Sequence, residues 1–587
     1  MQHRIIILIT CLMPCLMMAQ EKTAAIHLNQ SGFYINAPKI AVITGKMEAS
    51  EFYILRVSTN DTVFKAALSD SIKPMYSSAA TRIADFSAFN KPGKYTLYVS
   101  GVGNSYPFSI NNNAQHAVAV ASIKGFYYQR VSMPLETQYA GKWARPAGHP
   151  DIEVLIHPSA ASAQRPAGTS ISSPGGWYDA GDYNKYIVNS GITMGTLLSA
   201  YEDFSNYFDT LRTNIPESND KVPDLLNEVL YNLRWMLTMQ DPNDGGVYNK
   251  CTNAEFDGMV MPGVTKLPRY VVAKGTAAAL DFAAVMAQSA RIFRRFKKQL
   301  PGLADTCLAA AEKAWSWSLK NPRLSYNQNA INQQFTPKIN TGGYGDGNFK
   351  DEWFWAACEL AVTYGGGKYL DTIRQHLNDY ISIPSWNNMY LLGYYTLLRN
   401  QDLFRKAPQD IQSVIKQRFI AFADTLIANG GDRAYGTIMG QSRRDFIWGS
   451  SSVAMNQSIA LINAYKLTGD RKYIAKALTN LDYVLGRNAT GFCFVTGIGS
   501  KSTMHPHHRP SVADGIEEPL PGLIAGGPNP GKQDRCAGYT SNLPAESYLD
   551  HDCSYASNEI AINWNAPLVY VICAFEALQF KAGYSKK

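Results

Sequence analysis

Residues 222–240 read VPDLLNEVLYNLRWMLTMQ, and the apolar side chains of this stretch recur every three or four positions. They fall on one face of a helix: Leu225, Leu226, Val229, Leu230, Leu233 and Leu237. About twelve stretches with this pattern follow one another between residues 114 and 581. Six helical hairpins can close into a double ring, so the sequence predicts a mainly α protein whose residues 114–581 form an (α/α)6 barrel. The loops at one end of such a ring gather into a cleft.

The segment before the helices, residues 24–110, has a different pattern. Short runs rich in β-branched and aromatic residues alternate with turn sequences about every ten residues. We expect strands at 39–44, 52–58, 62–68, 81–87 and 93–100, which together form a small all-β sandwich. As the role of this domain, we favour packing support for the barrel over sugar binding.

Composition excludes several classes of protein. The chain has 587 residues, of which 46% are hydrophobic and only 17% are charged, so it is too apolar for a disordered protein. The net charge of +8 is spread along the chain without a run of Lys or Arg, which argues against a nucleic-acid partner. An uncharged partner fits better, because the 34 Tyr, 24 Phe and 10 Trp can stack on sugars as well as fill a core.

The first residues have the layout of a secretory signal peptide. An apolar stretch over residues 5–18 ends at a small residue, so residues 1–19 are expected to be cleaved off. This predicts a secreted, periplasmic or cell-surface protein of a bacterium. Cys11 or Cys15 could carry a lipid anchor, although the residue before each is a poor match to the small residue required there. No later apolar run is long enough to predict a membrane span.

Seven cysteines remain beyond this segment, and they form no C-x-x-C pair. Their number is odd and a chain of this size does not depend on disulfides, so buried single thiols are the default interpretation. A zinc ribbon is not indicated. The seven are Cys251, Cys307, Cys358, Cys493, Cys536, Cys553 and Cys573.

Residues 175–186 read GGWYDAGDYNKY and place Asp179 and Asp182 three residues apart among glycines and aromatic rings. In a cleft, mutual repulsion and desolvation would tune the pKa values of the two acids, so that one holds a water molecule while the other removes its proton. Tyr178 is a candidate for contact with a ligand. A calcium-binding loop or the start of a helix is the alternative interpretation.

Residues 547–566 read SYLDHDCSYASNEIAINWNA and combine acids with aromatic rings. Glu559 is expected at the start of an apolar helix over residues 558–580, close to Asp550, Asp552 and Trp564. Aromatic surroundings and neighbouring carboxylates would raise the pKa of Glu559 and allow it to act as an acid. The alternative is an ordinary glutamate placed by the helix dipole.

Between these two stretches, a loop rich in Gly and Pro contains His505, His507, His508 and Arg509. Three histidines within four residues invite a metal, but the same side chains recognise the hydroxyl groups of neutral sugars. Because no cysteine or second histidine cluster accompanies them, we favour sugar recognition over zinc.

Taken together, these stretches resemble the family 9 glycoside hydrolases, which are inverting enzymes that cut β-1,4-glucans, in the subgroup with an N-terminal immunoglobulin-like domain. The resemblance runs from about residue 26 to residue 581. It implies an immunoglobulin-like sandwich followed by an (α/α)6 barrel catalytic domain. The matching motifs are HLNQSGFYINAPKIAVI, FYYQRVSMPLE, GGWYDAGDYNKY, DEWFWAACEL, FVTGIGSKSTMHPHHR and YLDHDCSYASNEIAINWNA.

The resemblance implies roles for individual residues. Asp182 matches the general base, Asp179 matches its partner in holding the attacking water, and Glu559 matches the general acid that protonates the departing glycosidic oxygen. Inversion requires the acid and the base to lie roughly 6.5–9.5 Å apart, with room for water between them. The resemblance also implies sugar contacts by His507, Arg509 and Asp550, and aromatic platforms at Trp564, Trp448 and Trp386.

The resemblance implies no required cofactor, but it raises two questions about metals. Relatives often bind calcium near the positions of Asp351 and Glu352, where the oxygen-rich sequence GDGNFKDE could supply hard ligands. Some relatives bind zinc through Cys and His in the loops after the first helix. Residues 126–190 contain no cysteine, so we predict no such zinc site.

The sequence thus predicts an endo-β-1,4-glucanase whose partner is a β-1,4-glucan poly- or oligosaccharide. Mixed-linkage glucan and xyloglucan are candidates, and no cellulose-binding module or dockerin-like repeat is visible to favour crystalline cellulose. One alternative is an exo-acting cellodextrin- or glucosamine-releasing hydrolase of the same family, since its members differ in the loops that block one end of the cleft. The other is a non-catalytic glucan-binding protein at the cell surface, which would need neither an acid nor a base.

Overall fold

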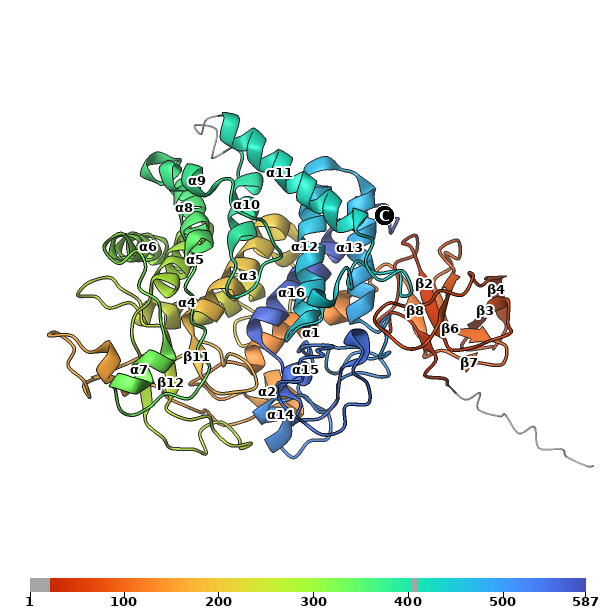
Figure 1. Cartoon of the computed structure of the whole chain (residues 1–587), viewed down its shortest axis with the longest axis horizontal. Coiled ribbons are helices and arrows are strands. Elements are labelled where there is room, and N and C mark those ends of the chain that lie inside the picture. Colours follow the sequence, from red (N-terminus) through yellow and green to blue (C-terminus); the bar gives the residue numbers. More distant parts are fainter. Residues whose placement is uncertain (1–21, 403–408, 587) are drawn as a thin grey trace, which may run out of the picture.

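The computed structural model describes residues 22–402 and 409–586. The predicted signal peptide, with Cys11 and Cys15, lies outside the described residues. Figure 1 shows a small β domain, coloured red, beside a much larger helical domain. None of the helices in the described part combines the length and the apolar character that a membrane span requires.

The N-terminal domain is a sandwich of two sheets. One has the order β1-β2-β5, and the other has the order β4-β3-β6-β7 with β8 paired to β6. Alternate side chains point into the core, where Phe52 and Ile54 of β3 meet Leu97 and Val99 of β6. The strands are β1 (Ile26–His27), β2 (Ile40–Thr44), β3 (Glu51–Arg56), β4 (Thr62–Ala67), β5 (Thr81–Asp85), β6 (Gly93–Val99), β7 (Gly103–Asn104) and β8 (Phe108–Ile110).

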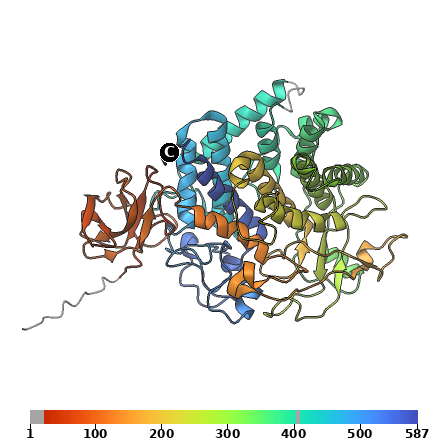
Figure 2. The ribbon, with the colours of Figure 1, turned by 180° about the vertical axis from the view of Figure 1, so that it is seen from behind.

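The second domain has the predicted (α/α)6 barrel fold. Consecutive helices pack against each other, and the last one, α16, packs against α1, α3 and α12, so the end of the chain closes the ring next to its beginning (Figure 2). The twelve helices that match the predicted stretches are α1 (His116–Tyr128), α3 (Ile187–Phe208), α4 (Asp224–Thr238), α5 (Thr276–Phe293), α6 (Leu303–Lys320), α8 (Lys350–Tyr364), α9 (Leu370–His376), α10 (Tyr390–Arg399), α11 (Gln409–Ala428), α12 (Ser450–Thr468), α13 (Arg471–Val484) and α16 (Ile562–Leu578).

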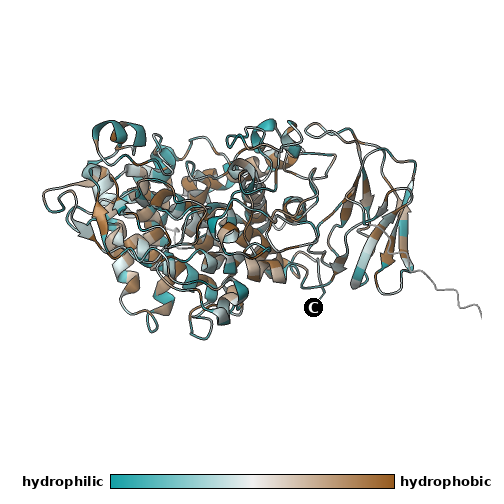
Figure 3. Cartoon of the chain, turned by 90° about the horizontal axis from the view of Figure 1, so that it is seen from below, coloured by the Kyte–Doolittle hydropathy of each residue, from teal (hydrophilic) through white to brown (hydrophobic). Residues whose placement is uncertain are grey.

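Burial separates the inner helices from the outer ones. Nearly every residue of α5 and α16 is buried, whereas α6 and α13 leave one face open to solvent. In Figure 3 the hydrophilic residues gather on outer helices and loops of this domain. A helix that is apolar all round must be enclosed by others, so these two sequences favour an inner position in the ring.

The long segments between helices contain elements that the sequence analysis treated as loops. Five short strands form one sheet with the order β10-β9-β13-β12-β11, and four short helices lie at the same end of the barrel (Figure 1). Strands of two to four residues are too short to show a periodic pattern. These elements are β9 (Val154–Ile156), β10 (Ser170–Ile171), β11 (Lys185–Tyr186), β12 (Lys250–Asn253), β13 (Arg269–Val271), α2 (Thr137–Ala140), α7 (Gln328–Gln334), α14 (Arg509–Ala513) and α15 (Tyr555–Asn558).

Buried hydrogen bonds join the β domain to the barrel. Asn29 Nδ2 donates to Asp482 Oδ1 at 2.8 Å, and both side chains are buried. Gln30 Oε1 accepts from the backbone N–H groups of Ser500 and Lys501 at 2.9 and 2.8 Å. The β domain therefore braces the segment that leads into the histidine loop, as expected of a domain that supports the barrel.

We expect Asn29→Ala to lower the melting temperature by a few degrees. The substitution leaves a buried carboxylate oxygen of Asp482 without its donor, which costs about 1–3 kcal/mol. Calorimetry of the full chain measures the effect. Asn90→Ala is the control, since this residue is exposed on the same domain. Equal melting temperatures for the two variants would contradict a supporting role for this contact.

Candidate active site

One cavity opens among the loops at the end of the barrel, with a volume of about 690 Å³. Asp179, Asp182 and Glu559 all line it, although 377 residues separate the second from the third. His507, Arg509, Trp386, Trp448 and Trp564, which the sequence also indicated, line it as well. Further lining residues are Tyr186, Phe256, Gly342, Gly343, Tyr344 and Tyr555.

Asp179 is buried at the inner end of this cavity. Its Oδ1 accepts from Asn189 Nδ2 at 2.5 Å, and its Oδ2 accepts from Tyr344 OH at 2.8 Å. Burial raises the pKa of Asp179 to about 8, the negative charge of Asp182 acts in the same direction, and the two hydrogen bonds oppose the rise. Asp179 therefore holds a proton over much of the neutral range.

Asp182 has a different environment. Asn184 Nδ2 and Tyr186 OH both donate to Oδ2, at 2.6 and 3.0 Å. Within residues 22–402 and 409–586, Oδ1 has no hydrogen-bond partner. The carboxylate is thus held from one side, and its second oxygen is left to accept from a ligand or a water molecule in the cavity.

Glu559 reaches the cavity from the far end of the chain. It lies in an extended segment that bridges to His507, so the prediction of a helix start is wrong: α16 begins three residues later, at Ile562. Burial raises the pKa of Glu559 well above its usual value, and the charges of Asp182 and Asp179 add to the rise. This shift favours the protonated form of the carboxyl group, which is the form that can donate a proton.

Backbone contacts at Gly181 bring the three loops together. A Cβ at this position would lie 2.1 Å from the carbonyl oxygen of His507, so only glycine fits. The Gly181 carbonyl oxygen accepts from Arg509 Nη1 at 2.7 Å, and the Asp179 carbonyl oxygen accepts from the Ile562 N–H at 2.8 Å. The glycine of the DAGDY sequence is therefore required for the close approach of the loops.

His507 and Arg509 are oriented by backbone carbonyl groups. His507 Nδ1 lies 2.5 Å from the carbonyl oxygen of Asp552, which only accepts, so Nδ1 carries the hydrogen and Nε2 is an acceptor. Burial lowers the pKa of His507, which keeps the ring neutral. Arg509 Nε donates to the Asp257 carbonyl oxygen at 2.9 Å, and its Nη2 is left for a ligand.

Aromatic rings form the walls of the cavity. Trp448 packs against Tyr555 with a centroid distance of 5.2 Å, and Trp386 meets Tyr344 edge-on at 5.3 Å. Trp564 packs over Gly449, where a Cβ would lie 2.5 Å from the indole nitrogen. Tyr344 and Tyr555 line the cavity but were not predicted as site residues. Tyr344 lies in a Gly-rich loop without a recognised motif.

Two residues proposed from the sequence to contact substrate do not line the cavity. Tyr178 is fully buried, and its hydroxyl group lies 2.8 Å from His149 Nδ1. Asp550 accepts from the backbone N–H groups of Met504 and His505, at 2.9 Å each, and thereby shapes the histidine loop. The prediction of sugar contact is wrong for Tyr178, whose side chain is enclosed. For Asp550, which is partly exposed, it stays a prediction.

Comparison with known families agrees with this geometry. The model of glycosyl hydrolase family 9 matches residues 115–572, and the model of the cellulase N-terminal ig-like domain matches residues 21–104. The chain belongs to glycosyl hydrolase family 9. This family membership makes the protein a glycoside hydrolase with an immunoglobulin-like N-terminal domain, as the sequence predicted.

Relatives support the same assignment over nearly the whole chain. A xyloglucan-specific endo-beta-1,4-glucanase of Bacteroides ovatus, BoGH9A, is 48% identical over 565 residues, covering 96% of this chain and 95% of its own. Endoglucanase D of Acetivibrio thermocellus is 33% identical and covers 94% of this chain and 83% of its own. A solved structure named Bacteroides ovatus GH9 superposes with a TM-score of 0.89 at 46% identity and covers 94% of this chain and 99% of its own. The enzyme is an inverting endo-β-1,4-glucanase.

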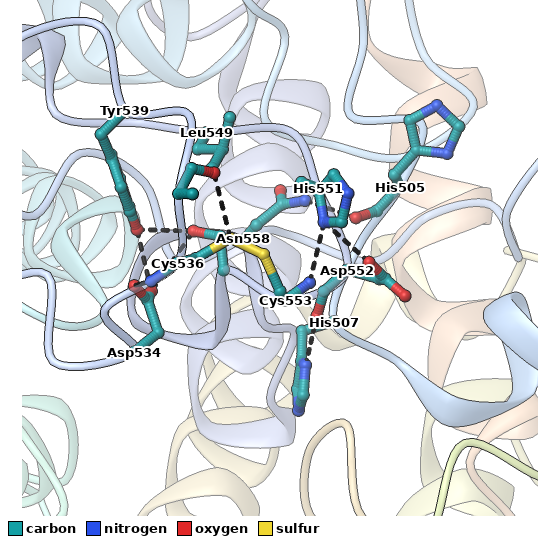
Figure 4. The surroundings of a disulfide bond; sticks show 12 residues. His505, His507, Asp534, Cys536, Tyr539, Leu549, His551, Asp552, Cys553 and Asn558 are labelled. Carbon is teal, nitrogen blue, oxygen red and sulfur yellow. Dashed lines mark hydrogen bonds and ion pairs between the residues drawn. A yellow bond between two sulfur atoms is a disulfide. The ribbon is translucent and has the colours of Figure 1, made fainter.

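A disulfide lies near the cavity of this family 9 enzyme. Cys536 and Cys553 are bonded, with their Cα atoms 5.7 Å apart (Figure 4). The prediction of single thiols is wrong for this pair, because the chain between them folds back on itself in a way that sequence spacing did not reveal. His551 lies beside the two sulfur atoms, but the disulfide uses both of them, so these three residues do not form a zinc site. The remaining five cysteines are buried thiols, as predicted: Cys251, Cys307, Cys358, Cys493 and Cys573.

A second group of acids lies at the start of α8. Asp351 and Glu352, where calcium was expected, are joined by Asp281 of α5 and Asp346 of the preceding loop. Both carboxylate oxygens of Asp281 and of Glu352 are buried without a hydrogen-bond partner in the described part of the chain. Burial and mutual repulsion raise the pKa values of Asp281 and Glu352. Calcium prefers oxygen ligands of this kind, but in the described residues the ligand atoms of these acids do not converge within 4.8 Å as a group of three.

We expect Asp179→Asn to stabilise the enzyme while it lowers activity about 100-fold or more. The folded-state pKa of Asp179 is about 8 and the ordinary value is 3.8. Between these values the folded state binds more protons than the unfolded state, so this residue reduces stability as pH rises. The melting temperature of the variant should exceed that of the wild type at about pH 7.5 and converge with it at about pH 4.

Thermal unfolding over this pH range measures the difference. Asp70→Asn is the control, because Asp70 is exposed on the β domain and its replacement should leave no pH-dependent difference. A variant of Asp179 that is less stable than the wild type near pH 7.5 would show that burial does not strain this carboxylate.

Proposed function

We propose that this endo-β-1,4-glucanase cleaves the backbone of xyloglucan, with Glu559 as the general acid and Asp182 as the general base. The observation that carries the catalytic assignment is the pairing in one cavity of a buried glutamic acid with an aspartate whose Oδ1 is unpartnered. The relative that is 48% identical over 565 residues is named as xyloglucan-specific, which supports the choice of substrate.

The proposed reaction is a single displacement. Asp182 Oδ1 accepts a proton from a water molecule that attacks the anomeric carbon, and Glu559 gives its proton to the departing glycosidic oxygen. Within the described chain, no hydrogen bond joins Glu559 to either aspartate, so sugar and water can enter between them. Asp179, which accepts hydrogen bonds from Asn189 and Tyr344, is proposed to hold the same water molecule from its other side.

The walls of the cavity suit a glucan chain. Sugar rings are apolar on their faces and polar at their edges, so Trp386, Trp448 and Trp564 are proposed to stack on them. His507 Nε2 and Arg509 Nη2 are proposed to bond the hydroxyl groups. Gly342 and Gly343 present backbone without side chains to the cavity, which leaves width for a backbone that carries xylosyl branches.

The alternatives from the sequence are less well supported. A non-catalytic glucan-binding protein has no use for three carboxyl groups crowded in one cavity, since burying them costs stability. An exo-acting cellodextrin- or glucosamine-releasing enzyme is not favoured, because the relatives at 48% and 33% identity are named as endoglucanases.

We expect xyloglucan to be hydrolysed with a kcat/KM at least about tenfold higher than mixed-linkage glucan or carboxymethyl cellulose. Viscosity should fall early relative to the release of reducing ends, and the first product should have the α configuration at its new reducing end. Reducing-end assays, viscometry and proton NMR measure these three properties. Faster hydrolysis of the unbranched glucans would overturn the choice of xyloglucan and leave the endoglucanase assignment intact.

Glu559→Gln and Asp182→Asn should each lower kcat about 100- to 10,000-fold while the fold is retained. Both substitutions keep the size of the side chain and remove one proton-transfer step. Glu517→Gln, at an exposed glutamate, is the matched control and should keep wild-type activity. Activity in either active-site variant equal to that of the control would refute the assigned acid or base.

A structural calcium ion is proposed at Asp281, Asp346, Asp351 and Glu352, and the chemistry itself needs no cofactor. A divalent cation there would neutralise buried carboxylates and fix the N-terminal end of α8 and the loop that carries Tyr344. Calcium removal with EGTA should lower the melting temperature by several degrees, and calcium should restore it better than magnesium. Absence of bound calcium by elemental analysis, together with an unchanged melting temperature, would rule out this site.

Export is proposed for the mature chain, to the periplasm, the cell surface or the medium. The signal-like residues 1–19 support it, and the disulfide between Cys536 and Cys553 supports it independently, because such bonds persist in oxidising compartments. A lipid anchor at Cys11 or Cys15 remains part of this proposal.

A further inference from the structure

Lys250 is a buried lysine behind the wall of the cavity. It lies on β12, and the whole residue is inaccessible to solvent. Its Nζ donates to Gln328 Oε1 at 2.6 Å, to Gly342 O at 2.7 Å and to Thr341 Oγ1 at 3.0 Å. Three acceptors match the three hydrogens of an ammonium group. All three are neutral, so no carboxylate compensates directly for the burial of this charge.

The acceptors Thr341 and Gly342 belong to the loop that forms the cavity wall. The Gly342 N–H donates to Tyr186 OH at 3.1 Å, and Tyr186 OH donates to Asp182 Oδ2 at 3.0 Å. Two residues further along the same loop, Tyr344 OH donates to Asp179. One ammonium group thereby fixes a short loop whose contacts reach both aspartates.

The charge of Lys250 is also directed at the base. The negative charge of Asp182 is the one that raises the pKa of this lysine, against a larger decrease caused by burial, which brings the value to about 7. The other titratable groups that face Lys250 are Tyr186 of β11, Tyr326 ahead of α7 and His157 after β9. The rings of Tyr186 and Tyr326 lie 5.5 and 5.7 Å from Nζ.

We propose that Lys250 is a positioning residue for the hydrolysis: it holds the loop 341–344 so that Tyr186 and Tyr344 orient the two aspartates, and it places a positive charge behind the base. Lys250 does not line the cavity, so it acts without touching substrate. The inference rests on the proposed role of Asp182 as the base.

The test compares two buried lysines in the full-length enzyme. Lys250→Met keeps the length of the side chain and removes both the charge and the hydrogen bonds; we expect kcat on glucan to fall roughly 10- to 100-fold. Lys39→Met is the matched control, because Lys39 is equally buried, in the β domain, and donates to the carbonyl oxygens of Ile35 and Ala37. The control should lose thermal stability and keep its kcat.

The pH dependence distinguishes positioning from general loss of structure. Asp182 is faced by Asp179, Glu559, His507, Tyr186 and Lys250. Arg509 also lines the cavity, and it stays in place when the charge of Lys250 is removed. Loss of the Lys250 charge makes the surroundings of the acids more negative, so the acidic limb of the kcat/KM profile should move to higher pH. Lys250→Arg keeps the charge and should return the limb toward its wild-type position.

A double-mutant cycle that combines Lys250→Met with Tyr186→Phe tests whether Lys250 acts through Tyr186. If Lys250 acts through the loop and Tyr186, the double variant should be about as slow as the slower single variant. Should Lys250→Met fail to fold, Thr341→Val removes one acceptor of Lys250, together with the hydrogen bond between Thr341 and Thr252, and leaves the charge in place. This variant should give a smaller fall in kcat with little change in the acidic limb.

Wild-type kcat and an unchanged acidic limb in folded Lys250→Met would overturn the proposal, as would wild-type kcat in Thr341→Val or full additivity in the cycle. Failure of the proposed function has a different signature. In that case Asp182→Asn would itself remain active, whatever the Lys250 variants do.

Discussion

The active site depends on the close backbone contact between Gly181 and His507. Any side chain at residue 181 would collide with the His507 carbonyl oxygen, so the loop of the two aspartates and the histidine loop meet only because glycine stands there. Arg509, two residues after His507, donates a hydrogen bond to the Gly181 carbonyl oxygen and so links the same two loops. The bridge from His507 to Glu559 then adds the final loop. Three segments from distant parts of the chain are thus aligned by backbone, which is less mobile than long side chains.

Burial then differentiates the three carboxyl groups that this alignment assembles. Burial raises the pKa values of Glu559 and Asp179 and so favours their protonated forms. Asp182 accepts hydrogen bonds from Asn184 and Tyr186, both on Oδ2. The two aspartates also differ in where their hydrogen bonds fall, because Asp179 accepts one on each oxygen and Asp182 accepts both on Oδ2. The stability that these buried acids cost is offset by the large apolar core of the ring.

The sequence was sufficient for the barrel helices and for the five longer strands of the sandwich, because each depends on a local pattern. Its motifs also named the three acids that line one cavity. Periodicity located α4 to within two residues at either end. Contacts between distant segments could not be predicted from the sequence. Asp281 lies close to Asp351 although the two are on different helices, and Tyr344, from a loop without a motif, donates a hydrogen bond to Asp179. The disulfide between Cys536 and Cys553 was missed for the same reason, since spacing does not show how a loop folds back.

The position of Glu559, the proposed acid, near the end of the chain couples assembly of the site to completion of the fold. Glu559 enters the cavity only where α16 packs between α1 and α12, and this packing closes the ring. A chain that lacks α16 would keep both aspartates and still have no acid beside them. The same closure excludes water from behind the site, because α16 is buried along almost its whole length. Formation of the core and assembly of the acid-base pair are therefore one structural event, which explains how a pair separated by 377 residues can be held in a single geometry.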